Sequence, residues 1–165
     1  MSEGAEGGRP VVARPVLVRP LEPRDAAAWS ALFRAYGEFY DTTFDESVLE
    51  RVWAQLLAAG SGIDGLVAER LPDDGDGAVI GLAHYRSHPD TFTGGRDWYL
   101  DDLYVAPEAR GGGTGTALIR GVAALASEQS GGTLRWITAE SNERARQVYE
   151  RIAVRTSWVT YEMTL

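Results

Sequence analysis

A strand-like run, a glycine-rich turn and a helix-like run follow one another between Leu103 and Leu118, in the stretch LYVAPEARGGGTGTAL. Glycine loses more conformational entropy on folding than any other residue, so four glycines within five positions need a physical reason. A turn of this kind before a helix presents unpaired backbone N–H groups beside the positive end of the helix dipole, an arrangement that binds phosphate. The alternative is a slack surface loop, and the glycines alone do not decide between the two.

Two familiar nucleotide-binding loops do not match this stretch. The phosphate loop of nucleotide hydrolases requires the lysine of G-x-x-x-x-G-K-[ST], and all 16 basic residues of the chain are arginines. The dinucleotide fingerprint G-x-G-x-x-G, counted from Gly113, fails because its sixth position is Leu118, and no early strand–helix–strand unit precedes it. A nucleotide-binding domain is therefore only a secondary alternative.

Composition limits the remaining classes of protein. A chain of 165 residues, 44% of them hydrophobic, is long enough for one compact domain, which we expect over residues 15–165 after a disordered tail over residues 1–14. The net charge of -8 argues against a nucleic-acid partner, and the lack of cysteine excludes a cysteine-bound acyl intermediate and thiolate metal sites. No signal-peptide or membrane-span pattern is present, so we expect a cytoplasmic protein with neither a membrane partner nor a metal.

Hydrophobic periodicity predicts a mixed α/β domain. Helical spacing occurs from about Pro23 to Tyr40, from the expected N-cap Asp45 to a stop at Gly60, over GTGTALIRGVAALASEQ and over NERARQVYERIA. Strand-like runs are VLVRPL, IDGLVAER, GAVIGLAHYRSH, WYLDDLYVAP, LRWITAE and SWVTYEMTL, of which the second and third form a hairpin. The expected order is strand, helix, helix, three strands, helix, strand, helix and strand.

Two spaced motifs carry a family resemblance. Arg110 to Gly115 follow the pattern R-x-x-G-x-G after YLDDLYVAPEA, and WITAESNERARQVYERIA follows downstream. Together they resemble the GCN5-related N-acetyltransferase (GNAT) superfamily, in which R-x-x-G-x-G binds the pyrophosphate of acetyl-CoA. The chain looks most like the branch of yeast histone and D-amino-acid acetyltransferases and diamine acetyltransferases. The resemblance implies the acyl-CoA N-acyltransferase fold, a mixed, mostly antiparallel sheet flanked by helices, with a V-shaped splay between the fourth and fifth strands.

The resemblance also implies roles for individual residues. Free N–H groups at about Leu103 and Val105 face the acetyl group and polarise its carbonyl, and Tyr149 protonates the departing coenzyme A thiolate. From periodicity alone, Tyr149 would instead be a core aromatic residue. Asn142 is expected to cap its helix and to contact the coenzyme. The expected coenzyme-binding residues are Leu103, Tyr104, Val105, Arg110, Gly111, Gly112, Gly113, Thr114, Gly115, Thr116, Asn142, Ala145 and Tyr149.

Two adjacent carboxylates, Asp101 and Asp102, stand in an otherwise apolar strand. Because neighbouring strand residues point to opposite faces, we expect one carboxylate on each face, and a buried unpaired one is costly. One of them is expected to open into the acceptor cleft, since the resembling diamine enzymes have an acidic residue there that faces the amine. The resemblance thus implies that Asp101 or Asp102 binds an ammonium group and accepts its proton, directly or through water. A salt bridge to an arginine is the alternative for either. Glu38, Tyr40 and Tyr85 are weaker candidates for lining the acceptor site.

The glycines of the loop are not equivalent in the motif. Gly113 and Gly115 fall on its fixed positions, whereas Gly111 and Gly112 fall on variable ones. We therefore expect Gly113→Val to abolish coenzyme binding and Gly111→Ala to be mild. His84 and the other histidine, His88, lack the spacing of a metal site or a catalytic triad and are expected to be structural, with a substrate contact as the alternative for His84.

The sequence thus predicts an N-acetyltransferase that passes acetyl from acetyl-CoA directly to a primary amine in a ternary complex. A polyamine, an amino acid and a protein lysine all remain open as acceptors. The alternative from another class is a catalytically silent module that binds acyl-CoA without turnover. The resemblance suggests a homodimer. One departure from the family is the stretch YERIAVRTSW, which lacks the glycine that usually ends the last helix.

Overall fold

A computed structural model describes residues 15–72, 77–129 and 131–165 of the chain. The tail expected over residues 1–14 and the acidic turn at residues 73–76 lie outside the described residues.

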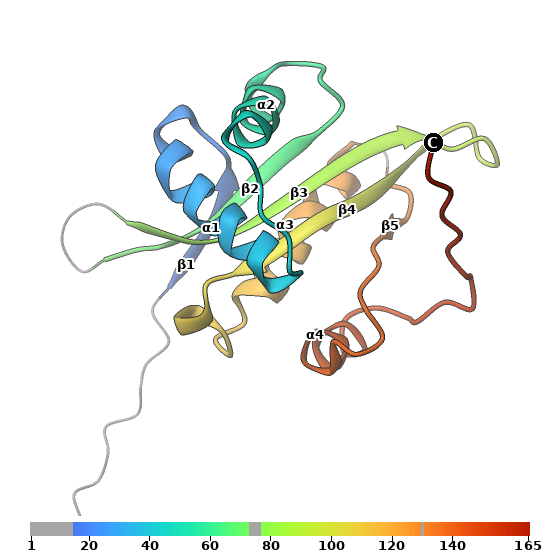
Figure 1. The fold of residues 1–165 in the computed structure, drawn as a ribbon. Coiled ribbons are helices and arrows are strands. Elements are labelled where there is room, and N and C mark those ends of the chain that lie inside the picture. The colour runs from blue at the N-terminus through green and yellow to red at the C-terminus, as the bar shows by residue number, and fades with distance from the viewer. Residues whose placement is uncertain (1–14, 73–76, 130) are drawn as a thin grey trace, which may run out of the picture.

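A single five-stranded sheet forms the centre of the described chain, with its strands in the order β1-β2-β3-β4-β5 (Figure 1). Strands β1 to β4 pair antiparallel with their neighbours, and β5 joins β4 in parallel. The expected hairpin is the pair β2 and β3, so the predicted mixed, mostly antiparallel sheet is confirmed. The strands are β1 (Val16–Pro20), β2 (Asp64–Arg70), β3 (Ala78–Pro89), β4 (Arg96–Val105) and β5 (Leu134–Arg135).

Helices cover both faces of the sheet, and in Figure 1 α1 crosses in front of it while α3 lies behind it. His84 on β3 contacts the ring of Trp29 in α1, whereas a Cβ on Gly81 would meet Leu118 of α3. Residues an odd number apart on a strand point to opposite faces, which places α1 and α3 on opposite sides. The helices are α1 (Ala26–Phe39), α2 (Glu46–Leu57), α3 (Thr114–Glu128) and α4 (Glu143–Tyr149), with single 3-10 turns at Pro23–Asp25 and Pro107–Ala109.

The apolar stripes of the helices explain why they pack where they do. Trp29, Leu32 and Phe33 recur at helical spacing in α1 and are buried against the sheet, and α3 buries Leu118 and Val122 in the same way. Each such side chain contributes about 1.5–3 kcal/mol by leaving water. The two helices therefore fix the sheet between two apolar layers and hold β4 in the middle of the molecule.

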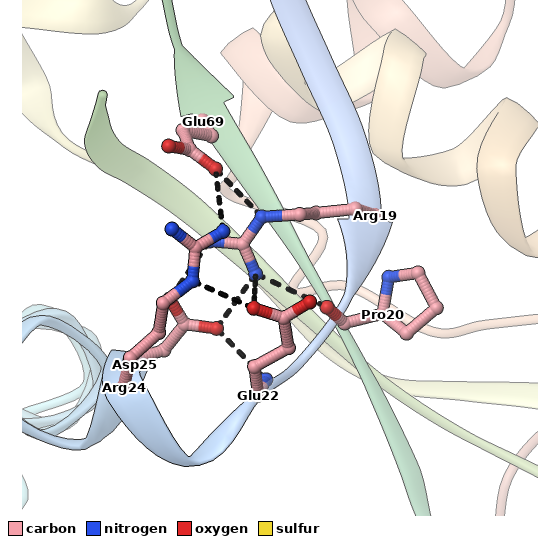
Figure 2. A network of polar contacts seen from close by, with 6 residues as sticks. All are labelled: Arg19, Pro20, Glu22, Arg24, Asp25 and Glu69. Atoms are coloured by element: carbon pink, nitrogen blue, oxygen red, sulfur yellow. Dashed lines mark hydrogen bonds and ion pairs between the residues drawn. The ribbon is translucent and has the colours of Figure 1, made fainter. Parts of the chain in front are cut away.

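A buried ionic network fastens the start of α1 to the sheet (Figure 2). The Arg19 guanidinium of β1 donates to both carboxylate oxygens of Asp25 at 2.8 Å, and its Nε donates to Glu69 of β2 at 2.6 Å. The backbone N–H of Glu22 also donates to Asp25, which is only 3% exposed. Because Arg19 donates to it, the pKa of Asp25 lies below its ordinary value.

Two expected strands differ in the structure. The run LRWITAE forms a strand only at Leu134–Arg135, and SWVTYEMTL at residues 157–165 forms none. Alternating apolar residues favour a strand only where a sheet edge is available to pair with, and residues 157–165 pair with no strand of the described chain. The side chains of Trp158, Tyr161 and Leu165 remain almost fully exposed as a result.

Within the described ranges, no helix is long and apolar enough to cross a membrane. The same residues contain no cluster of three or more histidine or acidic side chains able to hold a metal ion.

Candidate functional site

The site begins where β4 and β5 separate. The two strands pair only at Trp98 with Leu134 and at Tyr99 with Arg135, and β5 then ends. On the other edge of β4, the N–H of Ala106 donates to Ile80 of β3 at 2.9 Å. Because N–H directions alternate along a strand, the N–H groups of Val105 and Leu103 point away from β3, into the opening left by β5. This geometry agrees with the direction expected for these two groups.

The glycine loop leads from β4 into the N-terminus of α3. Gly113 is the N-cap with a φ of 86°, and the first bond of the helix runs from the N–H of Ala117 to the Gly113 carbonyl at 2.9 Å. The N–H groups of Thr114, Gly115 and Thr116 therefore precede the hydrogen-bond ladder of the helix and are available to an anion. A Cβ on Gly113 would meet no atom within 4 Å, so the loop is open on its outer side.

The structure revises the expectation that Gly111→Ala is mild. Gly111 has a φ of 90°, in the left-handed region that side chains rarely adopt, although its motif position is variable. Gly112 has no such φ, and a Cβ added to it would meet no atom within 4 Å, so it is the tolerant glycine of the loop. The motif pattern identifies residues that approach the ligand, but it does not show which of the remaining glycines the turn itself requires.

A cavity of about 620 Å³ lies between the loop, α3, α4 and the end of α1. Of the expected coenzyme-binding residues, all except Gly112 line it. Its walls also include three arginines that the sequence analysis did not single out, Arg120, Arg144 and Arg151. These cations lie on α3, on α4 and just after α4, and periodicity along one helix does not reveal what faces it across a cavity. The arrangement suits a large, polyanionic ligand.

Arg110 is held in place beside the loop. Its Nε donates to the Val105 carbonyl at 2.9 Å, and the guanidinium lies 5.3 Å from the centre of the Tyr104 ring. The bond uses one of the five N–H donors of the guanidinium, and the side chain lines the cavity with the others. The bond to Val105 therefore holds the charge of Arg110 at a fixed position beside the loop.

Tyr149 closes the opposite wall at the end of α4. The Asn142 side chain caps this helix by accepting from the N–H of Ala145 at 3.3 Å, as expected. The Tyr149 ring packs edge-on against Trp136 with the ring centres 5.4 Å apart. Burial, with a smaller effect of Tyr40, raises the pKa of Tyr149 to about 12. The phenol therefore carries its proton at neutral pH, as a general acid requires.

A second, smaller cavity of about 30 Å³ adjoins the first. It is large enough for one water-sized group such as an amine nitrogen. Four residues line both cavities, namely Tyr36, Tyr40, Leu103 and Tyr149. The remaining residues of its lining are Leu100, Asp101, Trp136, Ile137 and Thr138. Among the described residues of this lining, Asp101 is the one with a charged side chain.

The expectation that Asp101 and Asp102 lie on opposite faces is wrong. The register of β4 against β3 shifts, with His84 opposite Asp102 and Tyr85 opposite Leu100, so Asp101 is an extra residue in a β-bulge. His84 and Arg86 share a face of β3, and they contact Asp102 and Asp101 respectively. Both carboxylates therefore lie on the face that α1 covers.

The two carboxylates have different surroundings on that face. Asp102 Oδ2 lies 2.9 Å from His84 Nδ1 in a hydrogen bond, and after burial the Asp102 carboxylate is the main cause that raises the pKa of Tyr36. Asp101 Oδ1 lies 3.0 Å from Arg86, whereas its Oδ2 is buried without a hydrogen-bond partner among the described residues. Burial raises the pKa of Asp101, an effect that Arg86 opposes and Asp102 reinforces. Of the pair, Asp101 has the oxygen available to take a proton.

Residues 29–153 match the family described as Acetyltransferase (GNAT) family. The chain belongs to this family. It is 31% identical over 147 residues to the D-amino-acid N-acetyltransferase HPA3 of Saccharomyces cerevisiae, covering 89% of both chains. It is 36% identical over 140 residues to the thialysine N-epsilon-acetyltransferase of Mus musculus, covering 81% of this chain and 80% of the relative.

Solved structures agree with this membership. The ribosomal-protein-alanine N-acetyltransferase from Brucella melitensis biovar Abortus 2308 superposes with a TM-score of 0.71 and 27% identity, covering 92% of this chain and 100% of that one. The predicted GNAT fold and the acetyl-CoA-dependent N-acetyltransferase class are both confirmed.

Within this GNAT domain, the weaker acceptor-site candidates differ in their outcome. Tyr40 lines both cavities, as expected. Glu38 is exposed on α1 and lines neither cavity, because it stands on the outward side of the helix. Tyr85 is also absent from both linings, since it follows His84 on β3 and so points to the other face, where it packs against Trp98. Tyr36 and Trp136, which the sequence analysis missed, take their place.

Proposed function

We propose that this acetyltransferase passes acetyl from acetyl-CoA directly to a primary amine while both are bound. One observation carries the acceptor side of the proposal: the buried Oδ2 of Asp101 has no partner among the described residues and belongs to a small cavity that adjoins the large one. A buried carboxylate oxygen is costly unless something donates to it. An amine arriving in the small cavity supplies that donor.

The coenzyme side of the proposal rests on the large cavity. The free N–H groups at the start of α3, the helix dipole and Arg110 together favour the pyrophosphate. The N–H groups of Leu103 and Val105 face the opening between β4 and β5, where they can polarise a thioester carbonyl. Acetyl-CoA is the cosubstrate that supplies the activated acetyl group.

The transfer requires two proton movements, and each has a residue for it. An ammonium group in the small cavity gives one proton to Asp101 Oδ2 and becomes a neutral amine. Its nitrogen lone pair forms the new C–N bond to the acetyl carbon as the C–S bond breaks. The departing thiolate takes the proton of the Tyr149 hydroxyl. The second proton of the attacking nitrogen restores the Tyr149 phenol by way of solvent, and Asp101 releases the net proton to solvent.

The small cavity also supports a cationic acceptor. Its polar lining combines one carboxylate with Tyr36, Tyr40, Trp136 and Tyr149, and aromatic faces attract ammonium groups. A volume of about 30 Å³ holds the amine nitrogen and little else of the acceptor. The named substrates of the relatives, D-amino acids and thialysine, are both amines of modest size. We therefore propose polyamines, amino acids and lysine side chains as the first acceptors to test.

A screen of thiol release tests this function. Purified protein is given acetyl-CoA with polyamines, D- and L-amino acids, lysine peptides or aminoglycosides, and free coenzyme A is measured over time. We expect release above the no-amine rate with at least one primary amine. Tight coenzyme A binding with no release for any acceptor would support the silent acyl-CoA-binding module instead.

We further propose that the active species is a homodimer that covers the carboxyl-terminal segment 157–165. The side chains of Trp158, Tyr161 and Met163 are 85%, 90% and 82% exposed, an unusual amount of clustered apolar surface for a lone domain. Sedimentation of the full chain and of a Trp158→Ser/Tyr161→Ser variant tests this. The proposal predicts a dimer for the full chain and a shift towards monomer for the variant, and a monomeric full chain contradicts it.

A further inference from the structure

A series of hydrogen-bonded side chains lies under the acceptor side of the site, with His84 at its centre. The His84 side chain is fully buried on β3, with Trp29 of α1 on one side and Asp102 of β4 on the other. The indole Nε1 of Trp29 lies 2.8 Å from His84 Nε2, and His84 Nδ1 lies 2.9 Å from Asp102 Oδ2. Both ring nitrogens are hydrogen-bonded, so the imidazole cannot turn without breaking a bond.

The two partners determine which ring nitrogen carries the hydrogen. An indole N–H can only donate, so His84 Nε2 must accept and carries no hydrogen. The carboxylate of Asp102 accepts, so His84 Nδ1 must be the N–H donor. His84 is thus a neutral imidazole in its Nδ1–H form. The hydrogen bonds run in one direction, from Trp29 through His84 to Asp102.

Tyr36 connects this hydrogen-bonded series with the two cavities. Burial and the neighbouring Asp102 carboxylate raise the pKa of Tyr36, and Tyr36 lines both the large and the small cavity. A phenol has one hydrogen to donate, and the neighbouring Asp102 carboxylate attracts it. The Tyr36 oxygen therefore keeps only its acceptor capacity for anything that enters the small cavity.

We propose that His84 is a positioning residue for amine recognition: it holds Asp102 so that Tyr36 presents its oxygen as a hydrogen-bond acceptor to the substrate nitrogen. The proposal rests on the proposed function, because it needs an amine acceptor. A neutral primary amine has two N–H groups and one lone pair. After Asp101 Oδ2 has taken the ammonium proton, one N–H held on the Tyr36 oxygen keeps the nitrogen in the small cavity while its lone pair attacks the acetyl carbon.

This role differs from that of an ordinary core histidine in what it predicts. A histidine that only fills the core affects folding and the active fraction, which lowers kcat without changing the KM for amine. A positioning histidine acts through the Tyr36 oxygen, which contacts the amine before and during reaction. Loss of a contact that binds the substrate and the transition state equally well raises the KM for amine and leaves kcat nearly unchanged.

The first test examines the tautomer in the wild-type protein without any substrate. Long-range proton–nitrogen correlation NMR on protein with isotope-labelled histidine reports which ring nitrogen is protonated. The chain has only 2 histidines, so a His88→Asn variant assigns the signals. We expect the Nδ1–H form for His84. An Nε2–H form or a doubly protonated ring overturns the proposal, because neither can accept from Trp29.

The second test is a double-mutant cycle between His84 and Tyr36. We expect Tyr36→Phe and His84→Leu each to raise the KM for amine about tenfold, with kcat and the KM for acetyl-CoA nearly unchanged. In the Tyr36→Phe background, His84→Leu should add nothing to the KM for amine, because both changes remove the same contact. Additive effects, or an unchanged KM for amine in His84→Leu, overturn the proposal.

A conservative variant keeps the cycle interpretable if His84→Leu folds poorly. His84→Asn retains an N–H donor close to the Nδ1 position, so it should keep the KM for amine within about twofold even while losing the Trp29 bond and some thermal stability. Exposed His88→Asn on the same strand is the matched control and should change neither quantity.

The two proposals fail in different ways. If the wild-type protein releases no coenzyme A with any amine, the proposed function fails, and the NMR result still decides whether the hydrogen-bond chain has the inferred direction. If the wild-type protein turns over but His84→Leu and Tyr36→Phe keep the KM for amine of the wild type, only the role of His84 fails.

Discussion

Arg86 lies 3.0 Å from one carboxylate oxygen of Asp101 and leaves the other, Oδ2, buried without a partner among the described residues. The guanidinium offsets part of the cost of burying this carboxylate, and the remaining oxygen stays available to a substrate. Asp102, one residue further along, is hydrogen-bonded to His84 and raises the pKa of the neighbouring Tyr36, after burial. In the proposed reaction the two adjacent carboxylates therefore have separate tasks, with Asp101 serving the amine directly and Asp102 orienting its neighbours.

Asp101→Asn should lower kcat/KM for amine by about 10²- to 10⁴-fold, because the amide cannot take the ammonium proton. The affinity for acetyl-CoA, measured by calorimetry, should not change, since Asp101 does not line the large cavity. Glu38→Gln is the matched control, because this exposed acid lines neither cavity. Equal losses in the two variants would assign the effect to overall charge and contradict a specific role for Asp101.

The pH dependence of Asp101 follows from the direction of its shift. Burial raises the pKa of Asp101, so the carboxyl remains protonated to a higher pH than an exposed aspartate and can act as a base only above that point. We expect the acid limb of kcat/KM to lie above the ordinary aspartate range of about 3.9. Arg86→Met removes the opposing charge and should move this limb to still higher pH.

Tyr149→Phe should lower kcat by about 10²- to 10⁴-fold through loss of the proton donor, with little change in coenzyme affinity. Because the pKa of Tyr149 is raised to about 12, the wild-type phenol remains protonated across the range in which most enzymes are assayed. Any fall of kcat below about pH 10 must then arise elsewhere. The exposed Tyr161→Phe is the control, and a kcat for Tyr149→Phe like that of this control would rule out the acid role.

The loop glycines should separate by backbone conformation. Gly111→Ala and Gly113→Ala each place a side chain in the left-handed region, which costs about 1–2 kcal/mol, and should weaken acetyl-CoA binding about tenfold. Gly112→Ala should stay within about twofold of wild type, because its φ is ordinary and its surroundings are open. Gly113→Val should abolish measurable binding. Calorimetric affinities in which Gly112→Ala is the worst of the three alanine variants would contradict this order.

Asp25→Asn should reduce the free energy of unfolding by about 1.5–3 kcal/mol, because it removes one of the two carboxylates that pair with Arg19 while Glu69 remains. The folded-state pKa of Asp25 is lowered, so its stabilisation is present above the unfolded value of about 3.9 and is lost as pH falls through the folded value. Urea unfolding should show the gap between wild type and variant shrinking below about pH 4. Glu46→Gln, which breaks the exposed pair with Arg34, should cost less than about 1 kcal/mol at any pH.

The coenzyme half of the site could be predicted from the sequence because the residues that form each part of it are close together in the sequence. A strand, a glycine turn and a helix N-terminus are consecutive in the chain, and their spacing alone brings Val105, Gly113 and Thr114 to one cavity. The cap Asn142 and the cavity residue Tyr149 likewise belong to one short helix. Within such a unit, residue spacing determines geometry.

The acceptor half depends on register and on partners far away in the chain. The bulge at Asp101 reverses the face expected from simple alternation, and no sequence pattern reveals an extra residue in one strand. The contact of His84 with Trp29 joins residues 55 positions apart. The run SWVTYEMTL alternates like a strand, yet pairing depends on an edge that the pattern cannot supply.

The uncovered segment at residues 157–165 makes enzyme concentration an experimental variable. In the proposed homodimer the indole of Trp158 and the ring of Tyr161 are buried against another copy, and mass action favours that burial more at the concentrations used for NMR or calorimetry than at the dilutions of a kinetic assay. Affinities and rate constants collected at different dilutions then describe different assemblies. Specific activity measured across a dilution series is the first quantity to determine before variants are compared.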